Sequence, residues 1–421
     1  MIIFYLQQTM GKRKKRSFVQ MEQQSVDGYI FSESERDSLK KSAREHPRFN
    51  DCPTNDDLNV ATKMAALKAS HSIVSLVSFS GENVVFHTCG TIIEVDGNTN
   101  TVITSLHLLR ERRNDALSVE HTLIDNLKIV VQASDENSYI GKIETYDFHY
   151  NLLIVKFESK NFLQPARLRM IDDDFRLEIR LLVEMCPPAR YVQIDDPMRP
   201  HDLKVQIGDP ILVVARYFKA PNDVMAAPGT FSIRRCQASE YGCGELLSAD
   251  DCDIRRCGDG APYVNLAGEV IAIAYYELGG GSPFLPINIA YKWWNHYKKH
   301  KEHRHPSYGF KARNIYAATL CHLARFLKRF PSYSNGVQVV SVLPGSYAES
   351  AGLRDLDVIV KCDGKTVKGF LQLWELMWDK VGDVVKLKVA RVDNSSFETI
   401  TMVVGEAVPD ELNKWPQYDY C

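Results

Sequence analysis

The sequence lacks the features that would assign it to a membrane, a nucleic acid or a disulfide-rich secreted class. No apolar run approaches the roughly 20 residues that a membrane-spanning helix needs. The 51 Lys and Arg residues nearly balance the 53 Asp and Glu residues, so the net charge of −2 gives no global field that would attract nucleic acid or membranes. The ten cysteines form no CxxC pair and no regular framework, which favours free thiols in a reducing compartment. We therefore expect an intracellular protein, of the cytoplasm or nucleus in preference to an organelle.

The first 58 residues also lack sustained hydrophobic periodicity. We expect residues 1–58 to form a disordered tail of polar and basic character. Its apolar start is too short for the core of a secretory signal. The basic run Lys12–Arg16 has two interpretations, a nuclear-import or anionic-surface patch and a solvated part of the tail.

After this tail, short apolar segments alternate with turn residues. Residues 59–70 have helical spacing, with Val60, Met64 and Leu67 repeating along it. The expected strands that follow are 74–79, 84–87, 89–95, 101–104, 127–133 and 140–145. Short strands separated by Gly, Asp and Asn turns are typical of an all-β barrel or sandwich.

Three segments carry candidate catalytic positions. His107 lies in TSLHLL at a strand end, Asn151 in YDFHYNLLIVK, and Asp259 in the turn CGDGAP. In this order they resemble the motifs of the HtrA (Deg, protease Do-like) family of serine proteases, Thr-Asn-Ala-His-Val-Val, Asp-x-x-x-Asp-Leu-Ala-Leu-Leu-Lys and Gly-Asn-Ser-Gly-Gly-Pro. The resemblance extends over about residues 70–295 and implies a chymotrypsin-like double β-barrel.

The resemblance places His107 at the catalytic histidine, but Asn151 at the triad acid and Asp259 at the nucleophilic serine. An asparagine holds no charge, and this change in a working triad lowers turnover about 10⁴-fold. Asp147 matches the first, non-catalytic Asp of the motif. It cannot replace the acid, because four residues along a strand span about 13 Å.

The substitution at the nucleophile position is the more serious one. A carboxylate attacks amides poorly, and the resemblance puts Asp259 in an oxyanion loop formed with Cys257 and Gly258, where it would repel the negative charge that must develop. We expect Asp259 to form an ion pair with His107 that keeps the imidazole charged. The simpler interpretation of Asp259 is a turn residue, since Asp-Gly is good turn chemistry. Rescue by Cys257 is not favoured, because side chains two residues apart in a tight turn rarely point to one spot.

A second domain begins near Ser307. Its expected elements are a strand at 336–342, a turn and helix stop at 344–353, a hairpin turn at Asp363-Gly364, a helix at 370–380 and a strand at 384–391. They resemble a PDZ domain of the HtrA type, with Leu356 where the family usually has Gly. Upstream, Tyr308, Gly309 and Phe310 resemble the loop that binds the C-terminal carboxylate of a peptide. A glycine there lets successive backbone N–H groups face one point.

Trp374, Met377 and Trp378 fall at helical spacing on the expected groove helix, and we expect core packing for at least two of them. The histidines among residues 298–305 have no matching second cluster, so we interpret this run as a solvated linker and expect no metal and no cofactor.

The fold class expected is mainly β, a chymotrypsin-like double barrel followed by a small α+β PDZ domain. Its parts are the tail 1–58, a trypsin-like domain 59–297, a charged linker 298–306, the PDZ domain 307–405 and a C-terminal tail 406–421. Two functions remain. The favoured one is a catalytically inactive homologue that binds peptide C-termini or unfolded segments; the alternative is an active serine endopeptidase in protein quality control. Homo-oligomers or mixed oligomers with related subunits are compatible with both, and no nucleic-acid partner is expected.

Overall fold

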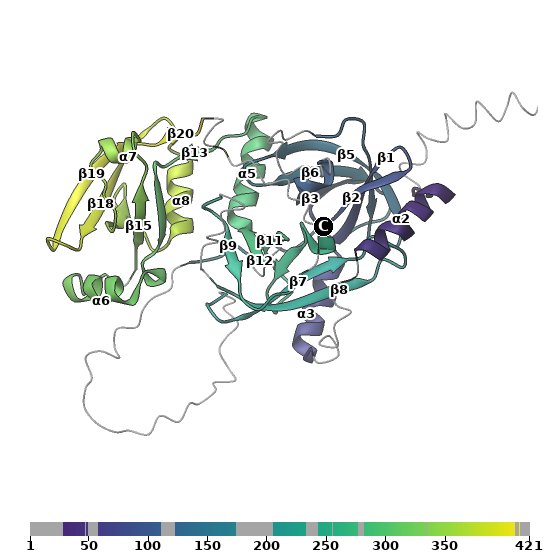
Figure 1. The fold of residues 1–421 in the computed structure, drawn as a ribbon, viewed down its shortest axis with the longest axis horizontal. Coiled ribbons are helices and arrows are strands. Elements are labelled where there is room, and N and C mark those ends of the chain that lie inside the picture. Colours follow the sequence, from purple (N-terminus) through teal and green to yellow (C-terminus); the bar gives the residue numbers. More distant parts are fainter. Residues whose placement is uncertain are drawn as a thin grey trace, which may run out of the picture.

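A computed structural model describes residues 28–46, 48, 58–110, 123–173, 205–232, 243–254, 256–276, 282–333, 335–408 and 412. The basic run Lys12–Arg16 and almost all of the expected C-terminal tail lie outside this part of the chain. Three β-structures follow one another along the sequence, and Figure 1 shows the C-terminal one at the far end of the molecule from helix α2.

The first β-structure is a closed barrel with the strand order β1-β2-β3-β6-β5-β4. Its strands are β1 Ile73–Ser80, β2 Asn83–Asp96, β3 Thr99–Ser105, β4 Lys128–Gln132, β5 Ser138–Asp147 and β6 Leu152–Glu158. They contain the six segments predicted from the sequence, although two of these merge into the single long strand β2. The interior is filled tightly: a Cβ atom at Gly90 would come within 2.6 Å of a Val102 methyl group.

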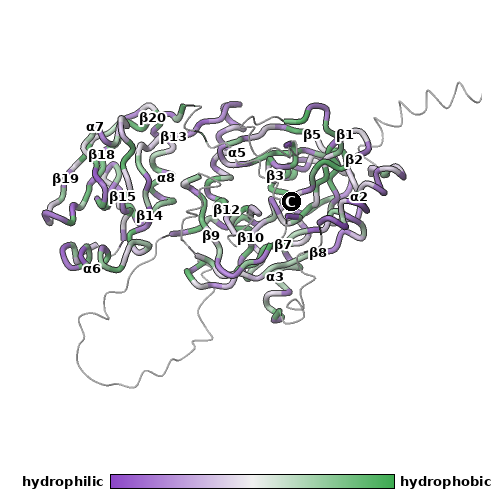
Figure 2. The backbone as a smooth tube through the Cα atoms, in the orientation of Figure 1, coloured by the Kyte–Doolittle hydropathy of each residue, from purple (hydrophilic) through white to green (hydrophobic). Residues whose placement is uncertain are grey.

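The second β-structure is a six-stranded sheet with the order β8-β7-β10-β11-β12-β9. Its strands are β7 Pro210–Arg216, β8 Val224–Thr230, β9 Leu247–Ala249, β10 Pro262–Val264, β11 Val270–Ala274 and β12 Ser282–Pro286. An isolated bridge between Thr230 and Asp250 brings the two outer strands together. Figure 2 shows much of the apolar sequence running through the strands of these two β-structures.

Helix α5, Ile287–His300, follows the second sheet and buries both Trp293 and Trp294. It also contacts the C-terminal part of the molecule, because Lys292 Nζ lies 3.0 Å from Asp379 Oδ2 (Figure 1).

The C-terminal β-structure is a sheet with the order β14-β15-β16-β18-β19, to which β17 adds at β16. Its strands are β14 Phe310–Asn314, β15 Val337–Val342, β16 Val358–Cys362, β17 Lys365–Thr366, β18 Val384–Arg391 and β19 Ser396–Val403. Helices α6 Leu320–Arg329, α7 Tyr347–Ser350 and α8 Phe370–Trp378 accompany it, and a short pair of strands, β13 Pro306–Ser307 and β20 Gly405–Glu406, lies at its entry and exit. The predicted Asp363-Gly364 hairpin is present, with both residues at positive φ.

The prediction that residues 1–58 are disordered is wrong for residues 28–46. Helix α2, Glu33–Glu45, begins with a capping box in which the Ser32 hydroxyl accepts from the Glu35 backbone N–H and the Glu35 carboxylate accepts from the Ser32 N–H. The Glu35 side chain is buried and also accepts from the Tyr29 hydroxyl at 2.7 Å. The serine-to-glutamate spacing was the available signal in an otherwise polar stretch.

Helix α3, Val60–Ser70, confirms the predicted helix, and its large apolar side chains are not its buried ones. Val60, Met64 and Leu67 are 77%, 48% and 54% exposed, whereas Ala65 and Ala69 are buried. Small side chains let the helix approach closely, and its backbone lies against Gly268, where a Cβ atom would come within 3.0 Å of the Ala65 carbonyl oxygen.

The interpretation of residues 298–305 as a solvated linker is wrong for His303 and His305. The first three residues of the run belong to α5. His303 stacks on Trp293 with ring centroids 5.0 Å apart, and His305 is buried beside Asp147. A run of charged residues is therefore solvated only where its side chains find no buried carboxylate or aromatic ring to contact.

Candidate functional site

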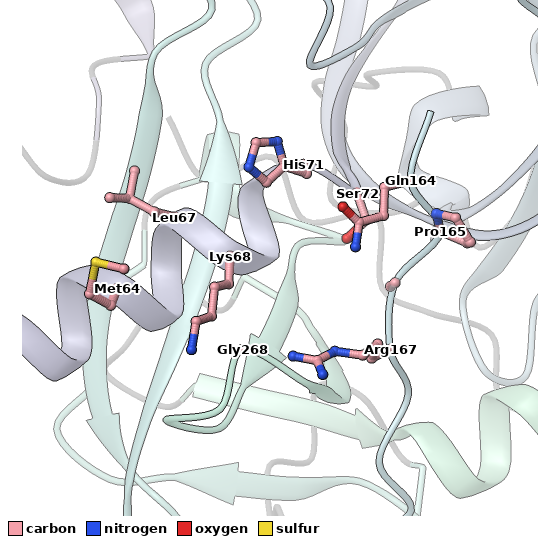
Figure 3. A pocket seen from close by; sticks show the side chains of 10 residues that line it. Met64, Leu67, Lys68, His71, Ser72, Gln164, Pro165, Arg167 and Gly268 are labelled. Carbon is pink, nitrogen blue, oxygen red and sulfur yellow. The ribbon is translucent and has the colours of Figure 1, made fainter. Parts of the chain in front are cut away.

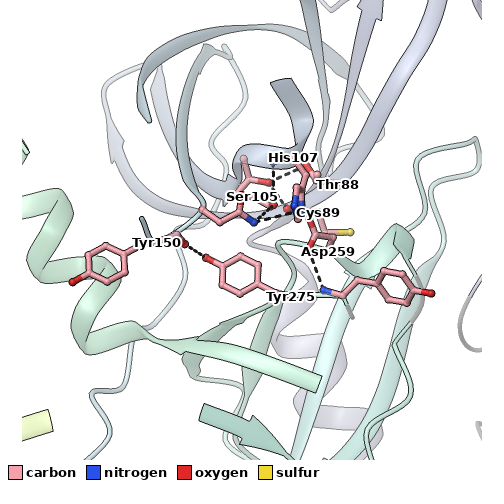
Figure 4. A network of polar contacts seen from close by, with 10 residues as sticks. Thr88, Cys89, Ser105, His107, Tyr150, Asp259 and Tyr275 are labelled. Carbon is pink, nitrogen blue, oxygen red and sulfur yellow. Dashed lines mark hydrogen bonds and ion pairs between the residues drawn. The ribbon is translucent and has the colours of Figure 1, made fainter. Parts of the chain in front are cut away.

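The fold brings the three positions with triad resemblance into one network. His107 lies in the 3-10 helix η2, Leu106–Leu109, directly after β3, and Asn151 lies in the turn between β5 and β6. Asp259 follows the 3-10 turn η3, Arg256–Gly258. Figure 4 shows His107, Ser105 and Asp259 converging, with Cys89 and Tyr275 beside them.

Asp259 contacts the imidazole at the nitrogen that a triad acid would use. Its Oδ2 lies 2.9 Å from His107 Nδ1, while its Oδ1 accepts from the Tyr276 backbone N–H at 3.1 Å. The side chain is 1% exposed. In a Ser-His-Asp triad the acid binds Nδ1 and the serine faces Nε2. The residue at the nucleophile position has therefore taken up the contact of the acid.

The expected contact between Asp259 and His107 is present, but the expected positive charge on the imidazole is not supported. Burial lowers the pKa of His107 by more than the Asp259 carboxylate raises it, and Arg110 and Arg256 lower it further. Burial raises the pKa of Asp259, yet attraction and hydrogen bonding to His107 outweigh this and leave it below its ordinary value. Both lowered pKa values are consistent with an ionised Asp259 carboxylate that accepts a hydrogen bond from the Nδ1–H of a neutral His107.

Asn151 is fully buried next to this pair. Its Nδ2 lies 3.0 Å from Ser105 Oγ and 3.4 Å from His107 Nδ1, and its backbone carbonyl accepts from the Leu106 N–H at 3.0 Å. It has a φ of 52°, a left-handed conformation that asparagine tolerates better than most residues. Asn151 thus holds the loop of His107 in place, while its neutral amide supplies no charge to the imidazole.

The expected oxyanion loop is closed by its own hydrogen bonds. The Asp259 N–H donates to the Arg256 carbonyl at 3.1 Å, and the Ala261 N–H donates to the Gly258 carbonyl at 3.0 Å. An oxyanion hole needs backbone N–H groups aimed at the substrate oxygen. The N–H at the nucleophile position is committed to the 3-10 turn. The carboxylate of Asp259 points to His107.

The cysteines considered as alternative nucleophiles are poorly suited. Cys257 is 2% exposed. Burial raises the pKa of the Cys252 thiol to about 11, so this side chain is protonated at neutral pH. A thiol is nucleophilic as its thiolate. Asp147 is also engaged elsewhere, because it accepts from Trp293 Nε1 at 2.8 Å and from the Tyr150 N–H at 3.0 Å.

The residues expected to bind a peptide carboxylate lie at the start of β14. Gly309 has a φ of 71°, and a Cβ atom there would come within 2.6 Å of Ser346 Cβ. Its carbonyl accepts from the Leu343 N–H at 2.8 Å and from the Ser346 hydroxyl at 3.1 Å. Glycine is therefore required at this turn. Phe310 is buried and pairs with Val342 of β15.

A groove wall accompanies this loop. Strand β14 is the outermost strand of its sheet, and α8 lies against it. Tyr308 reaches across to α8, where its hydroxyl lies 3.4 Å from the Trp374 carbonyl oxygen. An edge strand beside a helix is the geometry that accepts an extended peptide as an added strand. Trp374, Met377 and Trp378 are all buried, which confirms core packing for these residues.

Asp173 is a structural residue of this region that the sequence did not reveal. Helix α8 has Gly369 at its N-cap and no capping side chain of its own, so Asp173 caps it from outside the sheet, accepting from the Leu371 N–H at 2.9 Å. Asn314 of β14 donates to the same carboxylate oxygen at 3.3 Å. Burial raises the pKa of Asp173 to about 6. Because the capping carboxylate comes from 198 positions before Leu371, local sequence carries no sign of it.

A separate pocket of about 370 Å³ lies between α3 and residues 164–167 (Figure 3). Lys68, His71 and Arg167 line its rim, with Met64 and Leu67 on the helix beside it. None of the residues with triad resemblance lines this pocket.

The fold is that of a chymotrypsin-like serine protease. It combines a closed six-stranded barrel with a second six-stranded sheet, and together they bring His107 to the turn at 257–262. The C-terminal sheet with α8 adds a PDZ-like unit. The structure titled HtrA-type protease AlgW with tripeptide superposes with a TM-score of 0.51 at 17% identity, covering 83% of this chain and 98% of that one.

Sequence comparison makes the chain a homologue of the HtrA/Deg serine proteases. It is 28% identical over 331 residues to "Putative protease Do-like 14" of Arabidopsis thaliana, covering 77% of this chain and 64% of that protein. It is 25% identical over 263 residues to Serine protease HTRA1 of Xenopus laevis, covering 60% of this chain and 50% of that protein. The chain thus spans between half and two thirds of the length of these relatives. No family model matches it.

Among the helices that the structure describes, none combines the length and the apolar character needed to cross a membrane.

Proposed function

We propose that this protein is a catalytically inactive HtrA-like protein that binds the C-termini of peptides or of unfolded segments. The observation that carries the proposal is the contact between Asp259 Oδ2 and His107 Nδ1 at 2.9 Å. A carboxylate is present where a serine hydroxyl is needed, and the histidine directs its Nδ1 to that carboxylate.

Loss of catalysis follows from three features acting on the same step. The nucleophile is missing, the residue at the acid position is the neutral Asn151, and the N–H of Asp259 is bound to the Arg256 carbonyl. Each removes a different requirement for forming and stabilising a tetrahedral intermediate. Restoring one of them leaves the other two defects in place.

Peptide binding depends on other groups. The loop Tyr308-Gly309-Phe310 leads into the edge strand β14, and α8 forms the opposite wall. Affinity in this mode comes mainly from main-chain hydrogen bonds along the strand and from a carboxylate held by backbone N–H groups. The peptide present with the structurally similar AlgW agrees with binding as a property of that relative. We also propose a reducing intracellular compartment, in keeping with the absence of disulfide bonds among the cysteines that the structure describes.

Fluorescence polarisation with the full chain tests this function. The probe is a labelled pool of decapeptides with apolar C-terminal residues, used once with a free carboxylate and once as the C-terminal amide. We expect saturable binding of the free acid and at least about tenfold weaker binding of the amide, because a charge-assisted hydrogen bond is lost. Equal binding of the two pools would contradict carboxylate recognition. Cleavage of the peptides by the wild-type chain, with none by His107→Ala, would instead establish an active peptidase.

A further inference from the structure

A cluster of metal-ligating side chains lies outside the His107–Asp259 pair. Cys243 Sγ is 3.3 Å from Glu245 Oε2, and His149 Nε2 is 3.8 Å from the same oxygen. One ligand atom from each of the three residues lies within 4.8 Å of the other two. Cys243 is 3% exposed, and the side chains of His149 and Glu245 are 12% and 14% exposed. The cluster is therefore largely shielded from solvent.

The fold assembles this cluster from two β-structures. His149 lies in the turn between β5 and β6 of the closed barrel, and Cys243 and Glu245 lie just before β9 of the second sheet. No local spacing in the sequence joins them, so a search for short ligand motifs finds nothing. The expectation that no metal binds rested on such a search.

Two of the three separations suit a tetrahedral ion. Zn²⁺ bonds of about 2.3 Å to sulfur and about 2.0–2.1 Å to nitrogen or oxygen place neighbouring ligand atoms about 3.3–3.6 Å apart. The observed 3.3 Å and 3.8 Å lie within a few tenths of an ångström of these values. A thiolate, an imidazole and a carboxylate are also a donor set that Zn²⁺ accepts.

A neutral imidazole has a lone pair available for a metal. Cys243 would bind as the thiolate, so formation of the sulfur–zinc bond releases the thiol proton to solvent.

His305 lies beside the cluster, outside the group of ligand atoms that are within 4.8 Å of one another. Its ring lies 4.8 Å from that of His149, and its Nε2 is 2.8 Å from Asp147 Oδ2. Its Nδ1 is buried and has no hydrogen-bond partner within the part of the chain that the structure describes. A histidine that gives one ring nitrogen to a carboxylate commonly uses the other to bind metal.

We propose that His149, Cys243 and Glu245 bind one Zn²⁺ ion, and that the His305 ring moves towards them to supply Nδ1 as the fourth ligand. Four protein ligands make this a closed, structural site. It ties the turn that carries Asn151 to the loop before β9 and to the start of β13. The ion thereby connects both barrels to the entry of the PDZ-like unit, independently of whether that unit binds peptides.

Competition titration with a chromophoric zinc chelator tests the site on the full chain, stripped of metal and kept reduced. We expect one tight site per chain. Cys243→Ser and His149→Gln should each lower the affinity by at least about 100-fold, since loss of an outer-shell partner alone costs about 10–100-fold. His305→Ala should lower it at least about tenfold; unchanged affinity would remove His305 from the site. Co²⁺ in place of zinc should give a thiolate charge-transfer band that Cys243→Ser abolishes.

Two controls separate this site from other ligands. Cys321→Ser removes an exposed cysteine on α6, and His300→Ala breaks the stacked pair His296–His300 on α5. Both should retain the tight site and the cobalt band. Circular dichroism of the stripped variants shows whether each remains folded. The proposal is overturned if wild-type protein binds no stoichiometric zinc, or if a folded Cys243→Ser chain binds it as tightly as wild type.

Discussion

The two functional regions of this molecule have been affected differently by substitution. In the barrels, the chemistry expected of the fold depends on three side chains, and two of them, Asn151 and Asp259, are of the wrong type. In the C-terminal unit, the expected ligand contacts come from the backbone of a glycine turn and an edge strand, and that geometry is intact at Gly309. The proposed loss of catalysis depends on a few side-chain atoms, whereas the proposed backbone recognition depends only on the local conformation.

We expect the largest effect from a variant that rebuilds the triad and so removes the difference between the two regions. The double variant Asn151→Asp, Asp259→Ser places an acid opposite His107 Nδ1 and a hydroxyl at the nucleophile position. We expect it to hydrolyse an activated ester at least about 10³-fold faster than Asp259→Ser alone, because an Asn at the acid position lowers turnover by about 10⁴.

Burst kinetics with a nitrophenyl ester provide the measurement, with the triple variant that adds His107→Ala as control. Activity that survives loss of His107 would show that the hydrolysis does not use the rebuilt triad. Equal rates for the single and double variants would mean that the closed loop at 256–261, and not the side chains, limits catalysis.

Asp173 connects the two regions and makes their contact sensitive to pH. Its pKa is raised to about 6 in the folded protein, so the protonated form is favoured by folding. This stabilisation is fully present below the unfolded pKa of about 3.9 and is lost as pH rises through about 6. The free energy of unfolding should therefore fall by on the order of 2–3 kcal/mol between pH 4 and pH 7 from this group.

Urea unfolding of the wild type and of Asp173→Asn across this pH range isolates that contribution. The amide keeps an acceptor for the Leu371 N–H but does not titrate. The pH dependence should be smaller in Asp173→Asn by the amount assigned to Asp173. Identical pH profiles would show that the carboxyl group does not titrate near pH 6.

Substitution at Gly309 tests whether the backbone of this loop is needed for peptide binding. Gly309→Ala forces a side chain to within 2.6 Å of Ser346 Cβ at a φ of 71°, so the loop must shift. We expect peptide affinity to fall about tenfold or more, which corresponds to about 1.4 kcal/mol. Gly345→Ala is the matched control, since it has a φ of 75° but no atom within 4 Å of the added Cβ. If both variants bind as the wild type does, the loop is not the binding site.

The smallest expected effect is on stability and concerns Leu356, which stands where PDZ domains of the HtrA type usually have glycine. Leu356 has a φ of 69°, a conformation that costs a non-glycine residue about 1–2 kcal/mol, and its side chain is half exposed. Leu356→Gly should stabilise the protein by roughly 0.5–1 kcal/mol after the larger backbone entropy of glycine in the unfolded chain is subtracted. Guanidinium unfolding measures the change; a loss of stability would show that the leucine contributes packing that outweighs the strain.

Local patterns in the sequence predicted most of the strands, the two barrels and the PDZ-like unit. The strands of the closed barrel and the hairpin at Asp363-Gly364 depend on residues close together in the chain, so pattern and turn chemistry suffice. Helix α2 was missed because its polar composition hid a capping box at Ser32 and Glu35. The spacing of Val60, Met64 and Leu67 predicted α3 as a helix but did not reveal its buried face, because alanines make the close contact.

The candidate site could be predicted as a set of positions but not as a geometry. The contact between His107 and Asp259 was expected, whereas its attachment to Nδ1 and the lowered pKa of His107 depend on burial by the surrounding barrels. The bonds from the Tyr276 and Leu371 N–H groups involve backbone that no motif marks. Long-range contacts of this kind depend on the folded structure and leave no periodic trace in the sequence.

Degradation of an unfolded protein substrate tests the central claim most directly. Purified full-length chain is incubated with reduced, denatured casein, next to His107→Ala prepared in the same way as a control for contaminating protease. The contact between Asp259 and His107 predicts no cleavage above the control by either chain. Cleavage by the wild type that disappears in His107→Ala would contradict the account and show that this histidine serves a working nucleophile.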